Sequence, residues 1–227
     1  MSKTIEPESG SALAELSQDA SSRKRFLSMV GGAGAAGALA MFMAACGSDD
    51  DEKDSASSSG ENKTKSTGGD LEIVNYALTL EYLEAEFYAE VIKSGVVTDK
   101  AVGEAAKMIG QNEQEHVDAL LATAKKLGTP AKKPKTNFQP VIDGGEKMVL
   151  ETAATVENLG AAAYLGQAGR IQSKEVLAAA LAIHTVEARH AAALNKIVGK
   201  SIVPDGAFAK PASMEEVLPQ IKPFLAS

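Results

Sequence analysis

The sequences EQEH (residues 113–116) and EARH (residues 187–190) share a Glu-x-x-His pattern that decides the fold of this chain. Each lies in the middle of a long stretch whose apolar residues recur at helical spacing. Residues three apart project from the same side of a helix, so the glutamate and histidine of one motif can bind one ion together. Each motif is preceded by another helical stretch with a glutamate near its middle, Glu81 before the first and Glu157 before the second. Four carboxylates and two imidazoles from four helices are the ligand set of a carboxylate-bridged two-metal site.

Helical periodicity continues outward from these motifs over most of the chain. From residue 70 onward, apolar residues recur at spacings of three and four in four blocks, and strand-type alternation is absent. The sequence therefore predicts an all-α domain, a four-helix bundle over residues 70–200. The expected helices cover residues 70–94, 98–128, 143–170 and 173–199.

The connections between these helices also have recognisable signals. The sequence DGGE (residues 143–146) is a capping pattern for the third helix, and Ser173 is expected to cap the fourth. The Lys/Pro-rich stretch 129–140 is long enough to cross the bundle, so we expect a long crossover between the second and third helices.

The second pair of helices repeats the first pair. The aligned residues are Ala77/Ala153, Thr79/Thr155, Glu81/Glu157, Leu83/Leu159, Ala85/Ala161 and Tyr88/Tyr164 in one comparison, and Ile109/Ile183, Glu113/Glu187, His116/His190, Ala119/Ala193 and Leu120/Leu194 in the other. The chain therefore reads as a duplicated helical hairpin whose halves meet about a pseudo-two-fold axis. The shared polar residues should converge on that axis.

The glutamates occupy core positions in otherwise apolar stripes. In the first helix the stripe includes Val74, Leu78, Glu81 and Tyr88. Four buried carboxylates would repel one another unless positive charge compensated them, and two divalent ions supply four positive charges. Oxygen and nitrogen donors without sulfur suit iron or manganese, with zinc as an alternative. The predicted metal ligands are Glu81, Glu113, His116, Glu157, Glu187 and His190.

A surface origin for these residues is the competing interpretation. Most single Glu-x-x-His motifs are a surface glutamate and an incidental histidine, because glutamate is common on exposed helix faces. Two copies in register, each paired with an in-register glutamate, favour metal binding.

Other polar residues near the motifs leave alternatives open. Glu84 lies one turn from Glu81 but aligns with Gly160 in the repeat, so it either contacts the ligands, acts as an alternative ligand or is partly exposed. Tyr88 and Tyr164 can hydrogen-bond the site or donate an electron, or they are ordinary core tyrosines.

Two further features lie on the third and fourth helices. His184 is expected at the surface or beside the ligands, since its repeat counterpart is Gly110. The small residues of 160–163 favour close helix packing, with an access path for dioxygen or peroxide as the alternative.

Charge and cysteine content exclude several classes of function. The chain has 227 residues and a formal net charge of −7, with no clustered basic face, which argues against a nucleic-acid partner. Its single cysteine, Cys46, excludes an internal disulfide and a thiolate metal cluster.

The first 46 residues predict an export signal. The basic RKRFL (residues 23–27) precedes an apolar run, and MAAC (residues 43–46) resembles a bacterial lipobox in which Cys46 is lipidated. SRKRFL (residues 22–27) also resembles a twin-arginine signal, with Lys24 in place of the second arginine. An uncleaved anchor is the alternative. Either arrangement tethers the domain to the outer face of the cytoplasmic membrane.

The segments on either side of the predicted bundle differ from it in composition. Residues 47–69 contain Ser, Asp, Lys, Gly and Thr with no large apolar side chain, so we expect a disordered linker. Residues 201–227 read as a tail with one short helix that begins at Ser213.

Residues 70–199 resemble the ferritin-like superfamily. Within them, LTLEYLEA (residues 78–85) and VEARHA (residues 186–191) are similar to its branch of small bacterial ferritin-like and desiccation-related proteins. The resemblance implies the same six metal ligands, with Glu113 or Glu187 as the bridging carboxylate.

The function implied is that of an exported, membrane-tethered protein with a di-iron centre that oxidises Fe(II) with dioxygen or hydrogen peroxide. A non-catalytic, metal-stabilised surface protein for interaction or desiccation protection is one alternative. A dimanganese catalase is another. The sequence does not specify an oligomeric state.

Overall fold

The computed structural model describes residues 66–226, with side chains from residue 69 onward. The predicted export signal (1–46) and the predicted linker up to residue 65 lie outside the described residues. Within the described part, no helix combines the length and apolar content that a bilayer-spanning segment needs.

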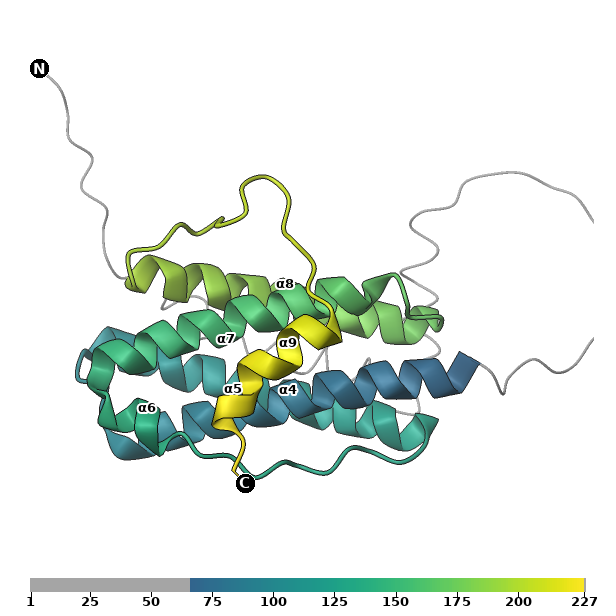
Figure 1. Ribbon diagram of the computed structural model, residues 1–227, viewed down its shortest axis with the longest axis horizontal. Helices are drawn as coiled ribbons and strands as arrows, with labels where there is room; N and C mark the ends of the chain where they lie inside the picture. Colours follow the sequence, from purple (N-terminus) through teal and green to yellow (C-terminus); the bar gives the residue numbers. More distant parts are fainter. Residues whose placement is uncertain (1–65, 227) are drawn as a thin grey trace, which may run out of the picture. The chain divides into compact units, whose positions relative to one another are not determined.

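Four long helices form two hairpins (Figure 1). The first hairpin joins α4 (Ser66–Ser94) to α5 (Lys100–Leu127), and the second joins α7 (Gly145–Ala168) to α8 (Lys174–Ile197). The shorter elements are α6 (Gln139–Asp143), α9 (Met214–Ile221) and the 3-10 helix η1 (Lys222–Phe224). Residues 66–226 contain no strand beyond one isolated bridge. The predicted all-α, four-helix fold is confirmed.

Side chains cap the starts of α5 and α8, and the cap of α8 is the predicted one. Asp99 accepts a hydrogen bond from the Val102 amide at 2.9 Å and caps α5. Ser173 accepts one from the Val176 amide at 3.3 Å and caps α8. Both side chains satisfy amides that the first helical turn leaves without a partner.

The first helix begins one turn earlier than the sequence predicts, at Ser66 and not at residue 70. Asp70 is buried, and its two carboxylate oxygens accept from the amides of Gln172 and Ser173, at 2.9 and 2.8 Å. The Asp70 side chain is therefore bonded to the loop between α7 and α8 and does not cap its own helix.

The predicted capping of the third helix is wrong. Asp143 ends α6, and α7 begins at Gly145 with Gly144 before it and no side-chain cap. The short α6 was not predicted. It forms because Pro140 suits a first helical turn and the turn buries Phe138 and Val141.

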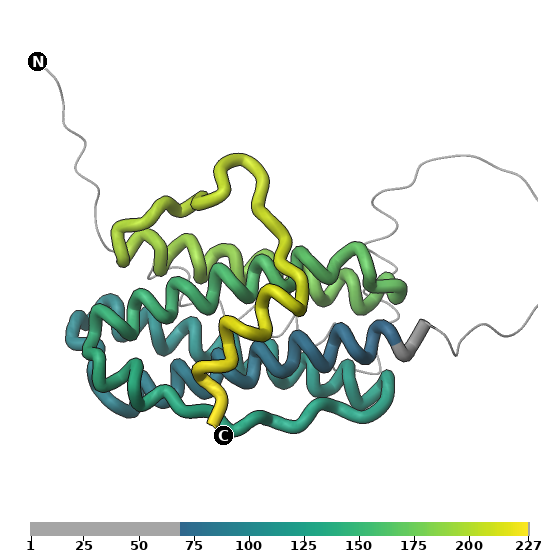
Figure 2. The backbone as a smooth tube through the Cα atoms, viewed as in Figure 1, coloured from purple at the N-terminus to yellow at the C-terminus, as the bar shows by residue number. Residues whose placement is uncertain are grey.

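The predicted crossover is present. After α5 the chain runs along the bundle to α6, so α5 and α7 point in the same direction (Figure 2). Asn75 of α4 holds the start of this segment: its amide donates to the Thr129 carbonyl and accepts from the Ala131 amide, at 3.0 and 2.7 Å. Lys133 pairs with Glu86 further along.

The C-terminal segment lies across α7 and α4 in Figure 1. Ser213 and Glu216 form a reciprocal capping box at the start of α9, as the sequence predicts for a short helix there. Val217 and Ile221 are buried against the bundle. Close approach to α7 is also enforced by a hydrogen bond from the Ala212 amide to the Ala162 carbonyl, at 2.9 Å.

Gly166 of α7 allows this approach. A Cβ atom built at Gly166 would lie 2.0 Å from the Ala212 carbonyl oxygen, so backbone would have to move. We expect Gly166→Ala to lower the free energy of unfolding by about 1–3 kcal/mol, although alanine is favoured over glycine inside a helix by about 1 kcal/mol. Gly103→Ala on α5, where nothing lies within 4 Å, should instead be stabilising. Urea unfolding of both variants measures the contrast, and equal effects would contradict it.

Candidate metal centre

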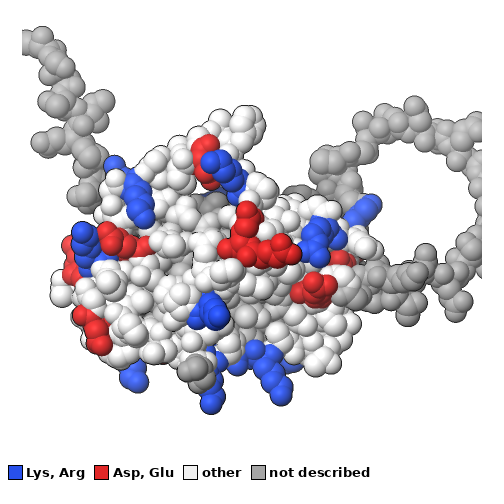
Figure 3. Space-filling model, viewed as in Figure 1, with Lys and Arg blue, Asp and Glu red and all other residues white. Residues whose placement is uncertain are grey.

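The six predicted ligands lie together between the four long helices, buried at mid-length. Glu81 comes from α4, Glu157 from α7, and α5 and α8 each contribute a Glu-x-x-His pair. The four carboxylates are 0% exposed, and His116 and His190 are 6% and 4% exposed. The surface interpretation of these residues is therefore wrong. The charged residues on the outer face drawn in Figure 3 do not form such a cluster: Lys and Arg alternate there with Asp and Glu.

Apolar residues enclose this polar layer on both sides along the helices. In α4, the buried Leu78 and Phe87 lie before and after Glu81. In α8, Ile183 and Leu194 lie before and after Glu187 in the same way. The carboxylates consequently lie in a region with little access to water.

Three carboxylates surround the imidazole of His116. Its Nδ1 atom lies 2.8 Å from Glu113 Oε2, 3.1 Å from Glu187 Oε1 and 3.2 Å from Glu81 Oε2. One nitrogen carries at most one proton, so it cannot donate to three oxygens at once. The arrangement gathers acceptors around one point.

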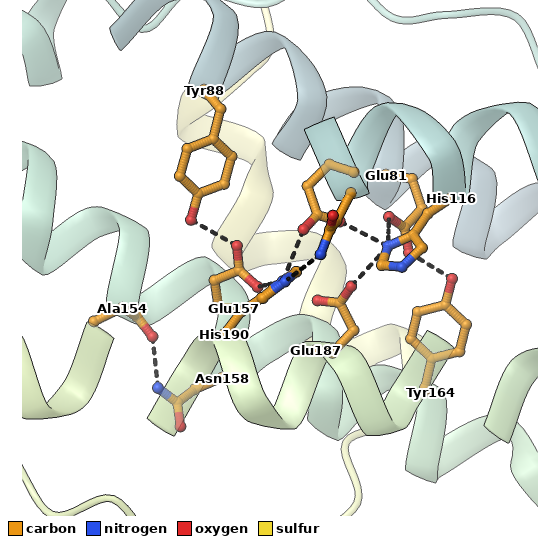
Figure 4. Close-up of polar contacts among 11 residues, drawn as sticks. Glu81, Tyr88, His116, Ala154, Glu157, Asn158, Tyr164, Glu187 and His190 are labelled. Atoms are coloured by element: carbon orange, nitrogen blue, oxygen red, sulfur yellow. Dashed lines mark hydrogen bonds and ion pairs between the residues drawn. The ribbon is translucent and has the colours of Figure 1, made fainter. Parts of the chain in front are cut away.

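The second imidazole has a matching environment. His190 Nδ1 lies 2.9 Å from Glu113 Oε1 and 3.2 Å from Glu157 Oε2. The two imidazole ring centroids are 6.4 Å apart. Figure 4 shows both rings turned toward the carboxylates between them. Glu113 thus presents one oxygen to each histidine.

These spacings fit metal coordination. Donor atoms about 2.1 Å from an ion and at right angles to one another are about 3 Å apart, as the histidine and carboxylate atoms are here. Two groups have donor atoms that all lie within 4.8 Å of one another: Glu81, Glu113, His116 and Glu187, and Glu113, Glu157, Glu187 and His190. Glu113 and Glu187 belong to both groups, which is the position of a bridging carboxylate.

Unsatisfied oxygens support the same interpretation. Among the described residues, five buried side-chain oxygens make no hydrogen bond: Tyr76 Oη, Glu84 Oε2, Glu113 Oε1, Glu187 Oε1 and Glu187 Oε2. Four of the five belong to carboxylates in this layer. Glu113 Oε1 and Glu187 Oε1 lie 2.9 and 3.1 Å from imidazole nitrogens, but each of these nitrogens faces more than one oxygen and has at most one proton to donate. Buried acceptors without donors are costly in a native protein, and cations at these positions would satisfy them.

Two tyrosines hold the outer carboxylates. Tyr88 donates to Glu157 Oε1 at 2.6 Å, and Tyr164 donates to Glu81 Oε1 at 2.5 Å (Figure 4). Burial raises the pKa of both phenols, and the adjacent carboxylates raise it further, so each remains an O–H donor. The two contacts are related by the repeat and connect its halves.

Removal of either phenol should weaken the fold. We expect Tyr88→Phe and Tyr164→Phe each to lower the free energy of unfolding of the metal-free protein by about 1–3 kcal/mol, because a buried carboxylate oxygen loses its donor. Tyr82→Phe, at a half-buried position on α4, is the control. Urea denaturation measures all three variants, and losses for Tyr88→Phe and Tyr164→Phe no larger than that for Tyr82→Phe would contradict the role.

Without ions, protons must compensate the carboxylates. Burial raises the pKa of Glu81, Glu84, Glu157 and Glu187, in the case of Glu81 to about 7. Glu113 is different. Burial favours its neutral form, but His116 and His190 outweigh burial and lower its pKa below the ordinary value.

The histidines hold protons in the same state. Burial alone would lower the pKa of each imidazole, but the surrounding carboxylates outweigh it. The pKa of His116 rises well above its ordinary value, and that of His190 rises to about 9. Metal ions and protons therefore compete for the same atoms.

This competition predicts how the stability of the metal-free protein depends on pH. A carboxyl group with a raised pKa holds its proton more tightly in the folded state than in the unfolded state. The free energy of unfolding therefore falls as pH rises through the interval between the two pKa values, which for Glu81 runs from 4.5 to about 7. A histidine with a raised pKa contributes fully below pH 6.5, and His190 loses that contribution by about pH 9. The melting temperature in EDTA should fall from pH 5 to pH 9.

Circular dichroism at a series of pH values measures this fall. The protein loaded with Zn(II) is the control, and its stability relative to the metal-free form should grow as pH rises, because metal binding releases protons. A metal-free melting temperature that stays constant or rises over that range would contradict the prediction.

The remaining polar residues occupy different positions. Glu84 is 2% exposed and lies in the polar layer. His184 is half-buried, and its Nδ1 contacts the Ala161 carbonyl at 3.0 Å, away from the carboxylates. Asn112 was missed: its Nδ2 lies 3.2 Å from His190 Nε2. Spacing along α5 gives no signal for that contact, because the repeat counterpart of Asn112 is Val186.

Comparison with known proteins identifies the family of the helical domain. A family model described as a ferritin-like domain matches residues 69–200. The search of curated proteins gave no match.

Proposed function

Because the chain belongs to the ferritin-like domain family, we propose that its bundle binds two iron ions and oxidises Fe(II) with dioxygen or hydrogen peroxide. Manganese and zinc are the alternative ions for the same donors. The geometry of Glu113 carries the proposal, since its two oxygens lie 2.8 and 2.9 Å from different imidazole nitrogens. A carboxylate so placed can hold two ions side by side.

Two iron ions held there would supply one electron each, enough with two protons to reduce hydrogen peroxide to two waters, or dioxygen to hydrogen peroxide. Tyr88 and Tyr164 fix the outer carboxylates by donating to one oxygen of each, which leaves the other oxygen turned inward. The side-chain amide of Asn112 lies at the outer nitrogen of His190, and its oxygen would accept the Nε2 proton when Nδ1 holds an ion, which would fix that ring. The apolar residues around the layer exclude water.

We propose that a small oxidant enters through an apolar pocket between the helices. It is lined by residues of all four long helices, including Ile73, Ala77, Leu120, Tyr164, Val176 and Ala180. The ring of Tyr164 lines this pocket, while its hydroxyl group contacts Glu81. The pocket suits dioxygen better than a charged solute, because its lining is almost entirely apolar.

Anaerobic loading followed by oxidant tests the function. Full-length protein is mixed with two equivalents of Fe(II) and then with dioxygen or hydrogen peroxide, and oxidation is followed by absorbance. We expect oxidation of two Fe(II) per chain at a rate well above that of buffer. Oxidation at the buffer rate by protein that has bound iron would support the non-catalytic alternative. Oxygen evolution from peroxide by manganese-loaded protein would support the catalase alternative.

We further propose that the domain is exported and tethered through a lipid on Cys46, on the evidence of the leader sequence. Membership of the desiccation-related branch is proposed on the same basis, from residues 78–85 and 186–191. Expression of the full chain and of Cys46→Ser with a labelled fatty acid tests the tether. Label in the wild type alone is expected, and unlabelled wild-type protein would contradict it.

A further inference from the structure

Glu84 lies where the two repeated hairpins meet. A small space between α4 and α7 is lined by three pairs of residues that the repeat relates to each other: Leu80/Val156, Leu83/Leu159 and Glu84/Gly160. Ile221 of α9 also lines this space. Because both members of each pair line it, the space lies on the pseudo-two-fold axis. A group on that axis is placed similarly toward both halves of the metal centre.

Only one of the two repeats can carry a carboxylate at this position. A Cβ atom built at Gly160 would lie 3.0 Å from Glu84 Oε1 and 3.1 Å from Glu187 Oε2. The glycine therefore leaves the room that the Glu84 and Glu187 carboxylates share. Glycine inside a helix costs about 1 kcal/mol relative to alanine. Its presence at position 160 therefore indicates that the space for the two carboxylates has a function.

Glu84 has no partner adequate for a buried charge. Its Oε2 atom makes no hydrogen bond, although the side chain is 2% exposed. Burial raises its pKa, and the charges of Glu187, Glu81, Glu157 and Glu113 raise it further, in that order. Glu84 also lies in the same polar layer as the ligands, because its Oε1 atom and Glu187 Oε2 are both within 3.1 Å of one point, the Cβ position at Gly160.

We propose that Glu84 is a fifth carboxylate of the metal centre and that it serves trivalent ions more than divalent ones. This inference rests on the two-ion site proposed above. Four carboxylates already match the charge of two divalent ions, so a fifth negative charge gains little in that state. Two trivalent ions carry two further positive charges, and Glu84, a buried carboxylate with an oxygen that makes no hydrogen bond, can offset one of them.

The test compares redox-inert ions of the two charges. Zn(II) and Ga(III), the latter supplied as its nitrilotriacetate complex, are titrated into full-length metal-free protein by calorimetry. We expect Glu84→Gln to weaken Ga(III) binding by about tenfold to a hundredfold and Zn(II) binding by less than about threefold. Glu84→Asp keeps the charge and should lose less Ga(III) affinity than Glu84→Gln. Glu72→Gln, at an exposed position on the same helix, should change neither.

The outcomes separate this inference from the proposed function. Wild-type protein that binds two Zn(II), with Ga(III) affinity unchanged in Glu84→Gln, would overturn the role of Glu84 alone. Equal losses for both ions would show a structural role and would also overturn it. A wild type that takes up no Zn(II) would overturn the two-ion site itself. Circular dichroism of the metal-free variants confirms folding, and Glu84→Asp provides the comparison if Glu84→Gln does not fold.

Discussion

Glu113→Ala is expected to weaken metal binding at both ion positions, by at least about a hundredfold each. Glu113 contacts both imidazole nitrogens, at 2.8 and 2.9 Å, and belongs to both groups of donor atoms. Glu81 belongs to the first group alone. Glu81→Ala should therefore weaken one position and leave the other within about threefold of the wild type.

Calorimetric titration with Zn(II) distinguishes the two variants. The wild type should bind two ions, Glu81→Ala one ion tightly, and Glu113→Ala none tightly. Glu104→Gln, at an exposed position on α5, is the control for a carboxylate lost from the same helix. One tight ion retained by Glu113→Ala would contradict its position between the two ions.

Removal of the ions should lower the stability of the folded protein strongly. A ligand that binds only the folded state at a thousand times its dissociation constant stabilises it by about 4 kcal/mol. For a folded region of this size, that corresponds to a rise in melting temperature of about 10 °C for a single ion. Loading also relieves the repulsion among four carboxylates that are 0% exposed.

Scanning calorimetry of Zn(II)-loaded and EDTA-treated protein at pH 7.5 measures this difference. The metal-free protein should still unfold cooperatively, because apolar residues pack on both sides of the polar layer. The Glu113→Ala variant should show little response to Zn(II). A wild-type melting temperature that does not change with Zn(II) would contradict binding in the interior.

The sequence predicted the fold class and the long helices because their signals are local. Apolar spacing defines α5 and α8, and Asp99 and Ser173 cap them through residues three positions away. The short α6 depends on burial of Phe138. The centroid of its ring lies 5.2 Å from that of Phe87 and 5.6 Å from that of Phe224. Those partners are far away in the sequence, so no local pattern reveals that helix.

The site could be predicted as a set of residues but not as a geometry. The repeat identified Glu113 and Glu187 as equivalent, and the structure places both within both groups of donor atoms. The sequence left the role of Glu84 open between a ligand contact, an alternative ligand and a partly exposed residue, because the repeat predicts pairs and Gly160 breaks the pair. The break itself is the signal, since a glycine in one copy leaves room for the carboxylate of the other.

Crystallography of Fe(II)-loaded protein, with anomalous diffraction at the iron edge, tests the central claim most directly. Two ions about 3.5–4 Å apart are predicted between α4, α5, α7 and α8, with Glu113 contacting both. Iron found only at the protein surface, or a polar layer whose carboxylates contact no ion after loading, would contradict the account.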